Sequence, residues 1–451
     1  MARLDGIKNW LSALLGLVLL LGGGVSLSGE EDELERLRRE RTDILQFGID
    51  SEVLSLLTTL RAEKTPEFNE LILEQASKTV NQDLVAAALD LFKEVNFAGA
   101  QELALGIIQD YNQYRTPVLL SGLAYLKSHV TPRHTQAVLA LLGSSNEALL
   151  LGAIDYVGSC GDENQVVTLL DLYEDSRTPE NAKPAVLSAL GNLGFPAASE
   201  RLTEIAVDPY ERAANRWYAA QALGKIGEAG AFTALQGLLG DPDPNLRSYV
   251  VEAVGRYPQG EDVLIEALRD SFWRVRLSAA RQLGERGSER AVDILIYKAK
   301  NDPENNVRNE AISALGKIGR QEGFETLREM AEARATLAPA VWAQAVQVLI
   351  QYDLRSSLPA IEKIIDEEFA GNNPYFLNHI GRLLSEKADA PYLADIYGKF
   401  MDHPSLIIKI YGIRGAELNQ ITGLRSRITE LSGEANHLSV RQAARRALEN
   451  L

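Results

Sequence analysis

The sequence predicts an all-α protein, an α-solenoid of stacked antiparallel helix pairs. Three observations support this fold class. A short motif recurs at nearly fixed spacing, apolar residues repeat with the period of a helix, and hydrophobic residues reach 46% while aromatic residues stay at 7%. The alanine- and leucine-rich segments also lack sustained strand-like alternation.

The recurring motif is a leucine or valine followed by glycine, and we expect it near the end of each second helix. Its glycines are 33, 33, 31, 29 and 32 residues apart, which is typical of repeat arrays. They are Gly158, Gly191, Gly224, Gly255, Gly284 and Gly316. At roughly 32 residues per unit, about 12 to 13 helix pairs fit between residues 42 and 451.

The interior of one repeat has the apolar face of a helix. Counted from Val307, small or apolar residues follow at offsets 4, 7, 8 and 11, as Ala311, Ala314, Leu315 and Ile318. These positions share one side of a helix with 3.6 residues per turn. The small alanines favour close packing of neighbouring helices.

A polar register accompanies the apolar one. Seven residues before the leucine or valine stands an arginine in four repeats, Arg216, Arg247, Arg276 and Arg308. Six residues before three of these stands an aspartate, Asp241, Asp270 and Asp302. Asp-Pro ends one helix and its carboxylate caps free amides, while the arginine can form a forked bond to the carboxylate of its own or the adjacent repeat. We interpret these residues as a structural ladder without a catalytic role.

Stretches such as Asp241 to Arg247 and Asp302 to Arg308 closely resemble HEAT repeats, in particular the short HEAT-like type first described in phycobilisome lyases. The resemblance is specific from about residue 180 to 350, and it implies a HEAT- or armadillo-like superhelix. Ankyrin, tetratricopeptide and leucine-rich repeats fit less well, because their signatures do not recur.

The chain divides into five expected segments. They are a signal peptide or uncleaved membrane anchor (1–28), a charged helical lead-in (29–41), degenerate N-terminal repeats (42–178), clear HEAT-like repeats (179–350), and degenerate C-terminal repeats with a cap (351–451).

The first segment resembles an export signal. Trp10 to Leu27 is an uncharged, mostly apolar run of 18 residues, preceded by Arg3 and Lys8. If uncleaved, it is just long enough to span a bilayer core of ~30 Å, with the N-terminus in the cytoplasm. Either way we expect the repeats to be exported, to the periplasm or the extracytoplasmic face of a membrane. A buried first helix is the alternative, and three consecutive glycines disfavour it.

Charge and motif content exclude several functions. With 46 basic and 62 acidic residues, the net charge of −16 disfavours a nucleic-acid partner. The five histidines form no His-Glu or His-x-x-x-His pair, and no phosphate loop or nucleophile elbow is found. We therefore expect no catalytic, cofactor-binding or metal-binding residues and no cofactor. Cys160, the only cysteine, is interpreted as a small buried filler rather than a reactive thiol.

By the geometry of HEAT repeats, positions one, two and five after the ladder arginine face the concave side. The candidate partner-binding residues at these positions are Trp217, Tyr218, Gln221, Tyr249, Glu252, Leu277, Arg281 and Glu310. Their three aromatic residues can bind a partner or can pack between repeats, and both interpretations are kept.

Together these observations predict a non-enzymatic scaffold or adaptor of a bacterial cell envelope. It would bind a protein or extended peptide on the concave face, with membrane contact only through an uncleaved N-terminal segment. The alternative is an enzyme on the same scaffold, such as a chromophore lyase, and the export signal argues against it.

Overall fold

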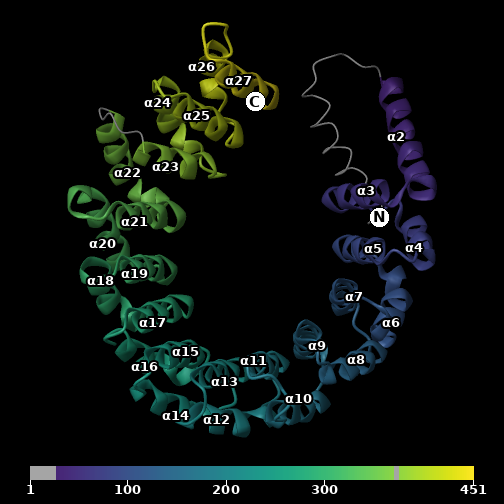
Figure 1. Cartoon of the computed structure of the whole chain (residues 1–451). Coiled ribbons are helices and arrows are strands. Elements are labelled where there is room, and N and C mark those ends of the chain that lie inside the picture. The colour runs from purple at the N-terminus through teal and green to yellow at the C-terminus, as the bar shows by residue number, and fades with distance from the viewer. Residues whose placement is uncertain (1–26, 370–374) are drawn as a thin grey trace. The chain divides into compact units, whose positions relative to one another are not determined.

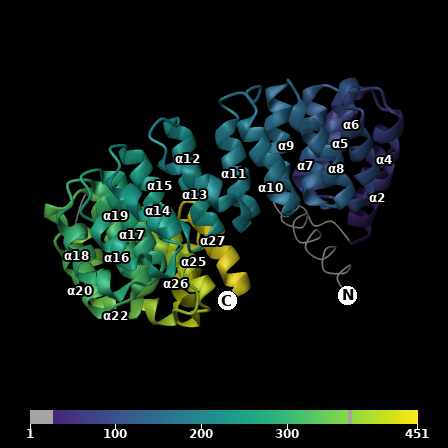
Figure 2. The same cartoon turned by 90° about the horizontal axis from the view of Figure 1, so that it is seen from below.

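Helices make up the regular structure of the residues that the computed structural model describes, 27–369 and 375–451 (Figure 1). Across these residues there are 26 α-helices, several short 3-10 segments and no strand. The predicted all-α solenoid is therefore confirmed. Internal contacts group the chain into two compact units, Met1–Ala189 and Leu190–Leu451, here called unit 1 and unit 2. A second view shows the helices of both units from below (Figure 2).

The described part of unit 1 contains ten helices, the last of which continues past its boundary. They are α2 (Leu27–Phe47), α3 (Asp50–Glu63), α4 (Asn69–Lys78), α5 (Gln82–Glu94), α6 (Gln101–Gln109), α7 (Thr116–Ser128), α8 (Pro132–Leu139), α9 (Glu147–Cys160), α10 (Asn164–Glu174) and α11 (Lys183–Leu193).

The other helices all belong to unit 2. They are α12 (Ser199–Val207), α13 (Ala213–Ile226), α14 (Ala231–Gly237), α15 (Pro244–Val254), α16 (Glu261–Ala267), α17 (Trp273–Glu285), α18 (Val292–Asn301), α19 (Asn305–Ile318), α20 (Gln321–Glu332), α21 (Pro339–Tyr352), α22 (Leu354–Phe369), α23 (Tyr375–Ser385), α24 (Ala394–Asp402), α25 (Leu406–Leu418), α26 (Arg425–Leu431) and α27 (Leu438–Asn450).

Even- and odd-numbered helices form two layers. An odd-numbered helix packs on the even-numbered helix before it, as α13 does on α12 and α19 on α18. Odd-numbered helices also stack on one another, as α13, α15, α17 and α19 do in turn. In unit 2 the odd-numbered helices lie along the inner side of its curve and the even-numbered ones along the outer side (Figure 1). The described residues hold thirteen such pairs, from α2–α3 to α26–α27, where the repeat length predicts 12 to 13.

The recurring glycines allow neighbouring odd-numbered helices to approach closely. A Cβ atom at Gly224 would lie 2.5 Å from the Cα atom of Ala253 in the next repeat, so any side chain there would push the next backbone away. The same contact joins Gly158 to Ala189, Gly191 to Ala222, and Gly284 to Ala314. Gly224 does not end its helix. That role belongs to Gly227, whose φ of 71° is a left-handed conformation that glycine adopts without strain.

The residue before each glycine forms part of the core. The leucine or valine of the motif is at most 1% exposed in all six repeats, at Val157, Leu190, Leu223, Val254, Leu283 and Leu315. Burying one such side chain contributes roughly 1.5–3 kcal/mol. The solenoid is therefore held together by a continuous apolar seam between its two layers within each unit.

The turn before α15 shows how the chain enters an odd-numbered helix. Pro244 opens the helix, where its missing N–H costs no hydrogen bond. The side chain of Asp243 accepts a hydrogen bond from the backbone N of Asn245 at 2.9 Å. Asp241 accepts one from the backbone N of Asp243 at 2.8 Å. The ladder aspartate thus caps an amide inside the turn, just ahead of the helix.

The predicted export segment lies outside the described residues, apart from its last two. The described chain begins with α2 at Leu27, so the predicted boundary at residue 28 falls in the first turn of this helix. The charged lead-in, residues 29–41, forms its central part. Among the described helices, none combines the length and apolar character that crossing a bilayer requires.

Candidate functional site

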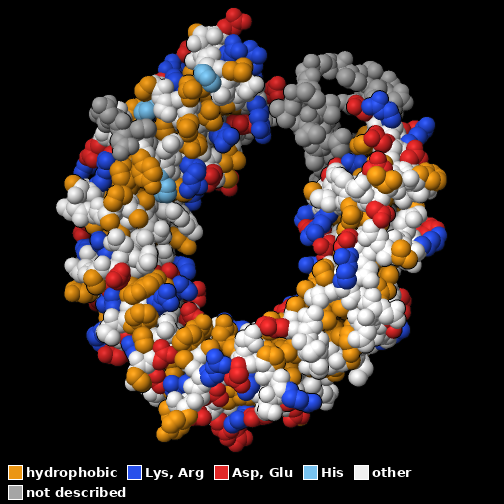
Figure 3. All heavy atoms as spheres, viewed as in Figure 1, with side chains coloured by type: hydrophobic (Ala, Val, Ile, Leu, Met, Phe, Trp, Pro, Cys, Tyr) orange, Lys and Arg blue, Asp and Glu red, His pale blue; other side chains and the backbone are white. Residues whose placement is uncertain are grey.

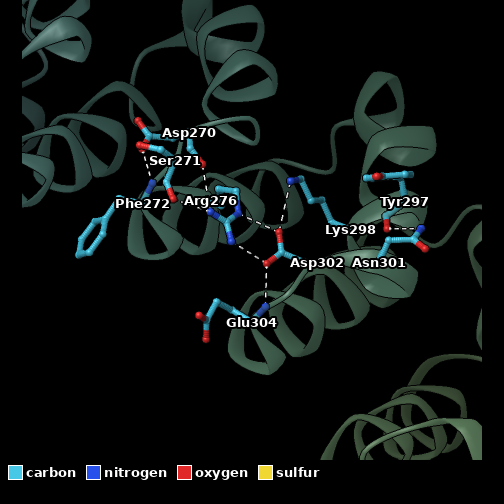
Figure 4. A network of polar contacts seen from close by, with 9 residues as sticks. All are labelled: Asp270, Ser271, Phe272, Arg276, Tyr297, Lys298, Asn301, Asp302 and Glu304. Carbon is cyan, nitrogen blue, oxygen red and sulfur yellow. Dashed lines mark hydrogen bonds and ion pairs between the residues drawn. The ribbon is translucent and has the colours of Figure 1, made fainter.

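Three of the four ladder arginines contact the aspartate of the following repeat. Arg276 donates from Nε and Nη2 to the two carboxylate oxygens of Asp302 at 2.8 and 2.7 Å (Figure 4). Arg247 binds Asp270 in the same forked way, with both distances 2.8 Å. Arg216 donates from Nη2 to Asp241 at 2.6 Å. The links therefore join consecutive repeats, which the sequence left open.

Two of these arginines, Arg247 and Arg276, also donate hydrogen bonds to the turn of their own repeat. Arg276 Nη1 donates to the backbone oxygens of Asp270 and Ser271 at 3.0 and 3.1 Å. Asp302 accepts further hydrogen bonds from the backbone N of Glu304 at 3.1 Å and from Lys298 Nζ at 3.2 Å. The Asp302 side chain is 0% exposed, so its charge depends on these partners.

The ion pairs of the ladder lower the pKa values of two of its carboxylates, Asp270 and Asp302. Burial by itself would raise the pKa of Asp270 and Asp302. Hydrogen bonds from Arg247 and Arg276, and from the turn amides, outweigh burial and lower both pKa values. The aspartates are therefore ionised at neutral pH and form charge-assisted bonds.

Arg308 has a different partner. Its Nε donates to the backbone oxygen of Ala299 at 3.0 Å, and in the described chain no carboxylate pairs with it. The reason is in the next turn, where Thr336 stands six residues before the ladder position that Trp342 occupies. Trp342 itself donates from Nε1 to the backbone oxygen of Ala331 at 2.8 Å. The series of ion pairs therefore ends after Asp302.

All eight predicted partner-binding residues lie on odd-numbered helices of unit 2, and all eight are half-buried. They project from α13, α15, α17 and α19, the helices on the inner side of this unit (Figure 1). In the space-filling view, basic side chains gather at this inner edge near α17 and α19 (Figure 3).

The three aromatic residues form one cluster across α13 and α15. The rings of Trp217 and Tyr249 are nearly parallel, with centroids 6.0 Å apart, and Tyr218 lies 6.0 Å from Tyr249 on the same side. Trp217 Nε1 donates to Asp243 at 2.5 Å. The cluster thus packs between two repeats and keeps a partly exposed face, and partner binding through it stays a prediction.

A polar row continues from this cluster along the stack. Arg281 lies between two carboxylates, 3.7 Å from Glu252 and 3.9 Å from Glu310. Glu252 also accepts a hydrogen bond from Ser278 Oγ at 3.3 Å. Leu277 is half-buried on the same helix as Arg281 and belongs to neither group. The two ion pairs of Arg281 are long, so the row is only loosely paired.

A groove of about 530 Å³ lies where α13, α15 and α17 meet. Three of the predicted residues line it, Gln221, Glu252 and Arg281. The others in its lining are Lys225, Ala253, Gly255, Arg256, Gln282, Glu285 and Arg286. The structure thus brings together one predicted residue from each of three consecutive repeats.

Three basic residues of this groove, Lys225, Arg256 and Arg286, were not predicted from the sequence, because the prediction counted only from the ladder arginine. A usable signal was present: Lys225 and Arg256 each follow the recurring glycine of their repeat directly. The Cδ atom of Lys225 lies 3.3 Å from the Cβ position of Gly191, so its side chain crosses the glycine of the preceding repeat. This position reaches the inner surface because the glycine beneath it has no side chain.

Histidines and the cysteine form no further site in the described residues. His134 is buried, and its Nδ1 lies 2.9 Å from the backbone oxygen of His129. The Cys160 thiol is half-buried at a helix end, and burial raises its pKa. In the part of the chain that is described, no group of three or more His, Cys, Asp or Glu side chains is placed to hold a metal ion.

Comparison with known families identifies the repeats. A family model described as Spirochaete HEAT repeat protein matches residues 45–447. The match includes the clear repeats and the degenerate repeats on both sides of them. No curated protein sequence matches the chain.

Solved structures with a similar arrangement have low sequence identity. Kap95p, from a structure with RanGDP, is 13% identical with a TM-score of 0.49, and the match covers 92% of this chain and 66% of that one. A Kap121p mutant is 13% identical with a TM-score of 0.45, covering 98% of this chain. The phycocyanin lyase CpcE–CpcF from Nostoc sp. PCC7120 is 22% identical with a TM-score of 0.33, covering 55% and 94%. This chain spans only 56% of the Kap121p chain, and likenesses at this level carry no information on function.

Proposed function

The chain belongs to the spirochaete HEAT repeat protein family, and we propose that it is a non-enzymatic scaffold or adaptor. Its partner is a protein or peptide that binds along the inner face of the odd-numbered helices of unit 2. The observation that carries this proposal is the groove between α13, α15 and α17, with the aromatic cluster beside it.

The contrast between the buried ladder residues and the half-buried residues of the inner face supports this proposal. The ladder residues Arg276 and Asp302 are buried and bind each other, so they are occupied in holding repeats together. Tyr218, Tyr249 and Arg281 are half-buried on the inner face and have weaker partners. Tyrosine, tryptophan and arginine are also enriched among the residues that contribute most to binding at protein interfaces.

We further propose that the repeats act outside the cytoplasm, in a bacterial cell envelope. The support is the uncharged run from Trp10 to Leu27 behind Arg3 and Lys8. A reporter enzyme that is active only after export, fused behind residue 60, tests this part of the proposal. Activity of the fusion supports export, and an inactive but stable fusion contradicts it.

Site-directed photo-crosslinking tests the binding face in living cells. A photoreactive residue replaces Tyr218 on the inner face, or Tyr297 on α18 as the matched control. Tyr297 lies in the outer layer and is 61% exposed, so it is more accessible than Tyr218. A partner that crosslinks through Tyr218 and not through Tyr297 supports the proposal. Equal crosslinking at both positions, or none at Tyr218, contradicts it.

The aromatic cluster needs a second experiment, because it also packs between repeats. Changing Tyr218 and Tyr249 together to Ala should reduce partner capture while leaving thermal unfolding nearly unchanged. A large loss of thermal stability would show that the cluster is part of the core.

The competing hypothesis is an enzyme on the same scaffold, such as a chromophore lyase. It rests only on the resemblance of the repeats to those of phycobilisome lyases. The visible absorption spectrum of protein purified from its natural source separates the two hypotheses, because a bound chromophore would favour the enzyme.

A further inference from the structure

The groove between α13, α15 and α17 is locally basic in an acidic protein. Its lining contains four cationic side chains, Lys225, Arg256, Arg281 and Arg286, and two carboxylates, Glu252 and Glu285. The lining therefore carries a net charge of about +2, against −16 for the whole chain. Such a local reversal of sign favours an anionic ligand at this place.

Three of the four cations have no carboxylate partner in the described residues. Lys225 Nζ donates to the neutral Oδ1 of Asn192 at 2.8 Å. Arg286 Nη2 donates to the backbone oxygens of Tyr257 and Pro258 at 3.3 and 2.8 Å. Both side chains therefore donate to neutral acceptors rather than to a carboxylate, although the charge of Glu261 acts on Arg286 from a longer distance.

The other nitrogen of Arg286 and the two remaining arginines also lack close carboxylate partners. Arg286 Nη1 is buried without any hydrogen-bond partner, although a buried guanidinium N–H normally has one. Arg256 is exposed, and among the described residues its side chain makes no ion pair. Arg281 approaches Glu252 and Glu310 only to 3.7 and 3.9 Å. The groove thus contains excess positive charge, with no ion pair at Arg256 and only long ion pairs at Arg281.

The electrostatic effect of this arrangement is visible at Lys225. Burial lowers the pKa of Lys225, and the nearby charge of Arg256 lowers it further. Two cations held together without an ion-paired carboxylate repel each other, so an anion between them stabilises both. The backbone oxygens at the helix ends carry only partial negative charges, and they do not replace a carboxylate.

The size of the groove and the aromatic cluster beside it indicate which class of molecule supplies the anionic group. The groove is about 530 Å³, which suits a few side chains rather than a folded surface. The aromatic cluster of Trp217, Tyr218 and Tyr249 lies next to Glu252 on the same two helices and offers apolar contact. A long polyanion such as nucleic acid or an anionic bilayer would also face the acidic remainder of the chain, whereas a short peptide segment would not.

We propose that this groove binds an acidic segment of a partner protein, with one or more side-chain carboxylates between Lys225, Arg256 and Arg286. The inference rests on the proposed adaptor function and specifies its partner. An apolar residue next to the acidic ones packs on the aromatic cluster.

A direct binding measurement with the full chain tests the inference. The probe is a short fluorescent polyglutamate peptide, and binding is followed by fluorescence anisotropy at low and high salt. The test variant is Lys225→Glu with Arg256→Glu. The control is Arg269→Glu with Lys300→Glu, which changes net charge equally through exposed cations of unit 2 outside the groove. We expect a loss of affinity of about tenfold or more in the test variant, little change in the control, and weaker binding at high salt.

Each other outcome overturns the inference. Absence of peptide binding, equal weakening in both double variants, or equally tight binding of a polylysine peptide excludes an acidic-segment site. Displacement of the peptide by inorganic phosphate at equal concentration shows a general anion site instead. Crosslinking at Tyr218 tests the adaptor proposal separately. If Tyr218 crosslinks a partner but the protein does not bind polyglutamate, the acidic-segment inference fails and the adaptor proposal stands.

Discussion

The helices α13–α19 and α21–α27 are built from the same repeat, yet they stabilise it differently. In the first group, arginine and aspartate form buried ion pairs from one repeat to the next, as between Arg276 and Asp302. In the second group, Trp342 on α21 and Lys409 on α25 replace the arginine, Leu377 stands at its place on α23, and α27 keeps an arginine, Arg441. The second group also lacks the recurring glycine, whose place is taken by Ile350 on α21 and Ser385 on α23.

One hydrogen bond is common to both groups. Arg216 and Arg308 donate to a backbone oxygen in the last turn of the preceding even-numbered helix, that of Ala206 and of Ala299. Two side chains in the second group do the same. Trp342 donates to Ala331, and Lys409 Nζ donates to Met401 at 3.1 Å.

The last backbone oxygens of a helix have no partner within it, and a buried one needs a donor. In these four repeats the residue at this position therefore caps the neighbouring helix. The ion pair to the next repeat is an addition that some repeats have and others lack.

Removing the arginine of a buried ion pair should have the largest effect. Arg276→Met leaves the fully buried carboxylate of Asp302 with only Lys298 as a charged partner, so the free energy of unfolding should fall by about 3–5 kcal/mol. Arg308→Met removes only a capping hydrogen bond and should cost about 1–2 kcal/mol. Urea unfolding followed by tryptophan fluorescence measures both, because Trp217, Trp273 and Trp342 all lie in unit 2. Equal losses would show that the ion pair adds nothing to the cap.

Adding one carbon at the close helix contact should have the next largest effect. Gly284→Ala places a Cβ atom 2.7 Å from the Cα atom of Ala314, so the backbones must move apart at a cost of about 1–3 kcal/mol. Gly237→Ala is the control, since nothing lies within 4 Å of its Cβ position in the outer layer. The control should be neutral or slightly stabilising, by up to about 1 kcal/mol. A similar loss in both variants would refute a special role for the recurring glycine.

The capping role of the ladder position can be tested where no ion pair is present. Trp342→Phe keeps an aromatic ring in the core and removes Nε1, which leaves the backbone oxygen of Ala331 unpaired. We expect a loss of about 1–2 kcal/mol in urea unfolding. Lys409→Met on α25 should have a smaller effect, because Lys409 is only half-buried and water can replace its Nζ. Unchanged stability in the tryptophan variant would contradict the capping role.

Acid should affect the two groups in different pH ranges. Burial lowers the pKa of His379 and His403 in the second group below the ordinary value of 6.5. Both are neutral when folded and take up protons more readily when unfolded, so stability falls as the pH drops below 6.5. Asp270 and Asp302 have lowered pKa values, so their contribution is lost only as the pH falls through 3.8 and below.

Hydrogen exchange at mildly acidic pH, corrected for intrinsic rates, compares the two groups directly. Protection of α23 to α27 should decrease first, while that of α13 to α19 stays. His403→Asn is the matched control, because an asparagine oxygen can still accept the hydrogen bond from the backbone N of Ser405 without titrating. This variant should show a smaller decrease near α25. Uniform loss across both groups would contradict the assignment.

Repeat length, helix faces and the ladder register were predictable from the sequence because they depend on local spacing. The direction of each ion pair was not, since a carboxylate in a turn is within reach of an arginine on either side until the repeats are stacked. The reason for the recurring glycine was also hidden. Gly224 reads as a helix-end signal, and only the neighbouring helix shows that it is a contact with Ala253.

The candidate site was predicted in part. Counting from the ladder arginine found Gln221, Glu252 and Arg281 of the groove. It missed Lys225, Arg256 and Arg286 of the groove. Outside the groove it missed Lys409, whose side chain differs from arginine although its hydrogen bond is the same. Side chains of different types can donate the same hydrogen bond to a backbone oxygen at a helix end, so residue type alone does not identify them. They can be identified only when the position of that oxygen is known.

The ladder also determines how such a chain can change its length during evolution. In three turns an aspartate, Asp241, Asp270 or Asp302, pairs with the arginine of the repeat before it and lies six residues ahead of the arginine of its own repeat. If residues 242–270 were lost, Asp241 would take the place of Asp270 ahead of Arg276 and would still meet Arg216. A whole segment from one ladder aspartate to the next can therefore be duplicated or deleted while every buried ladder arginine keeps an aspartate partner. An insertion within such a segment would leave one buried charge without its partner.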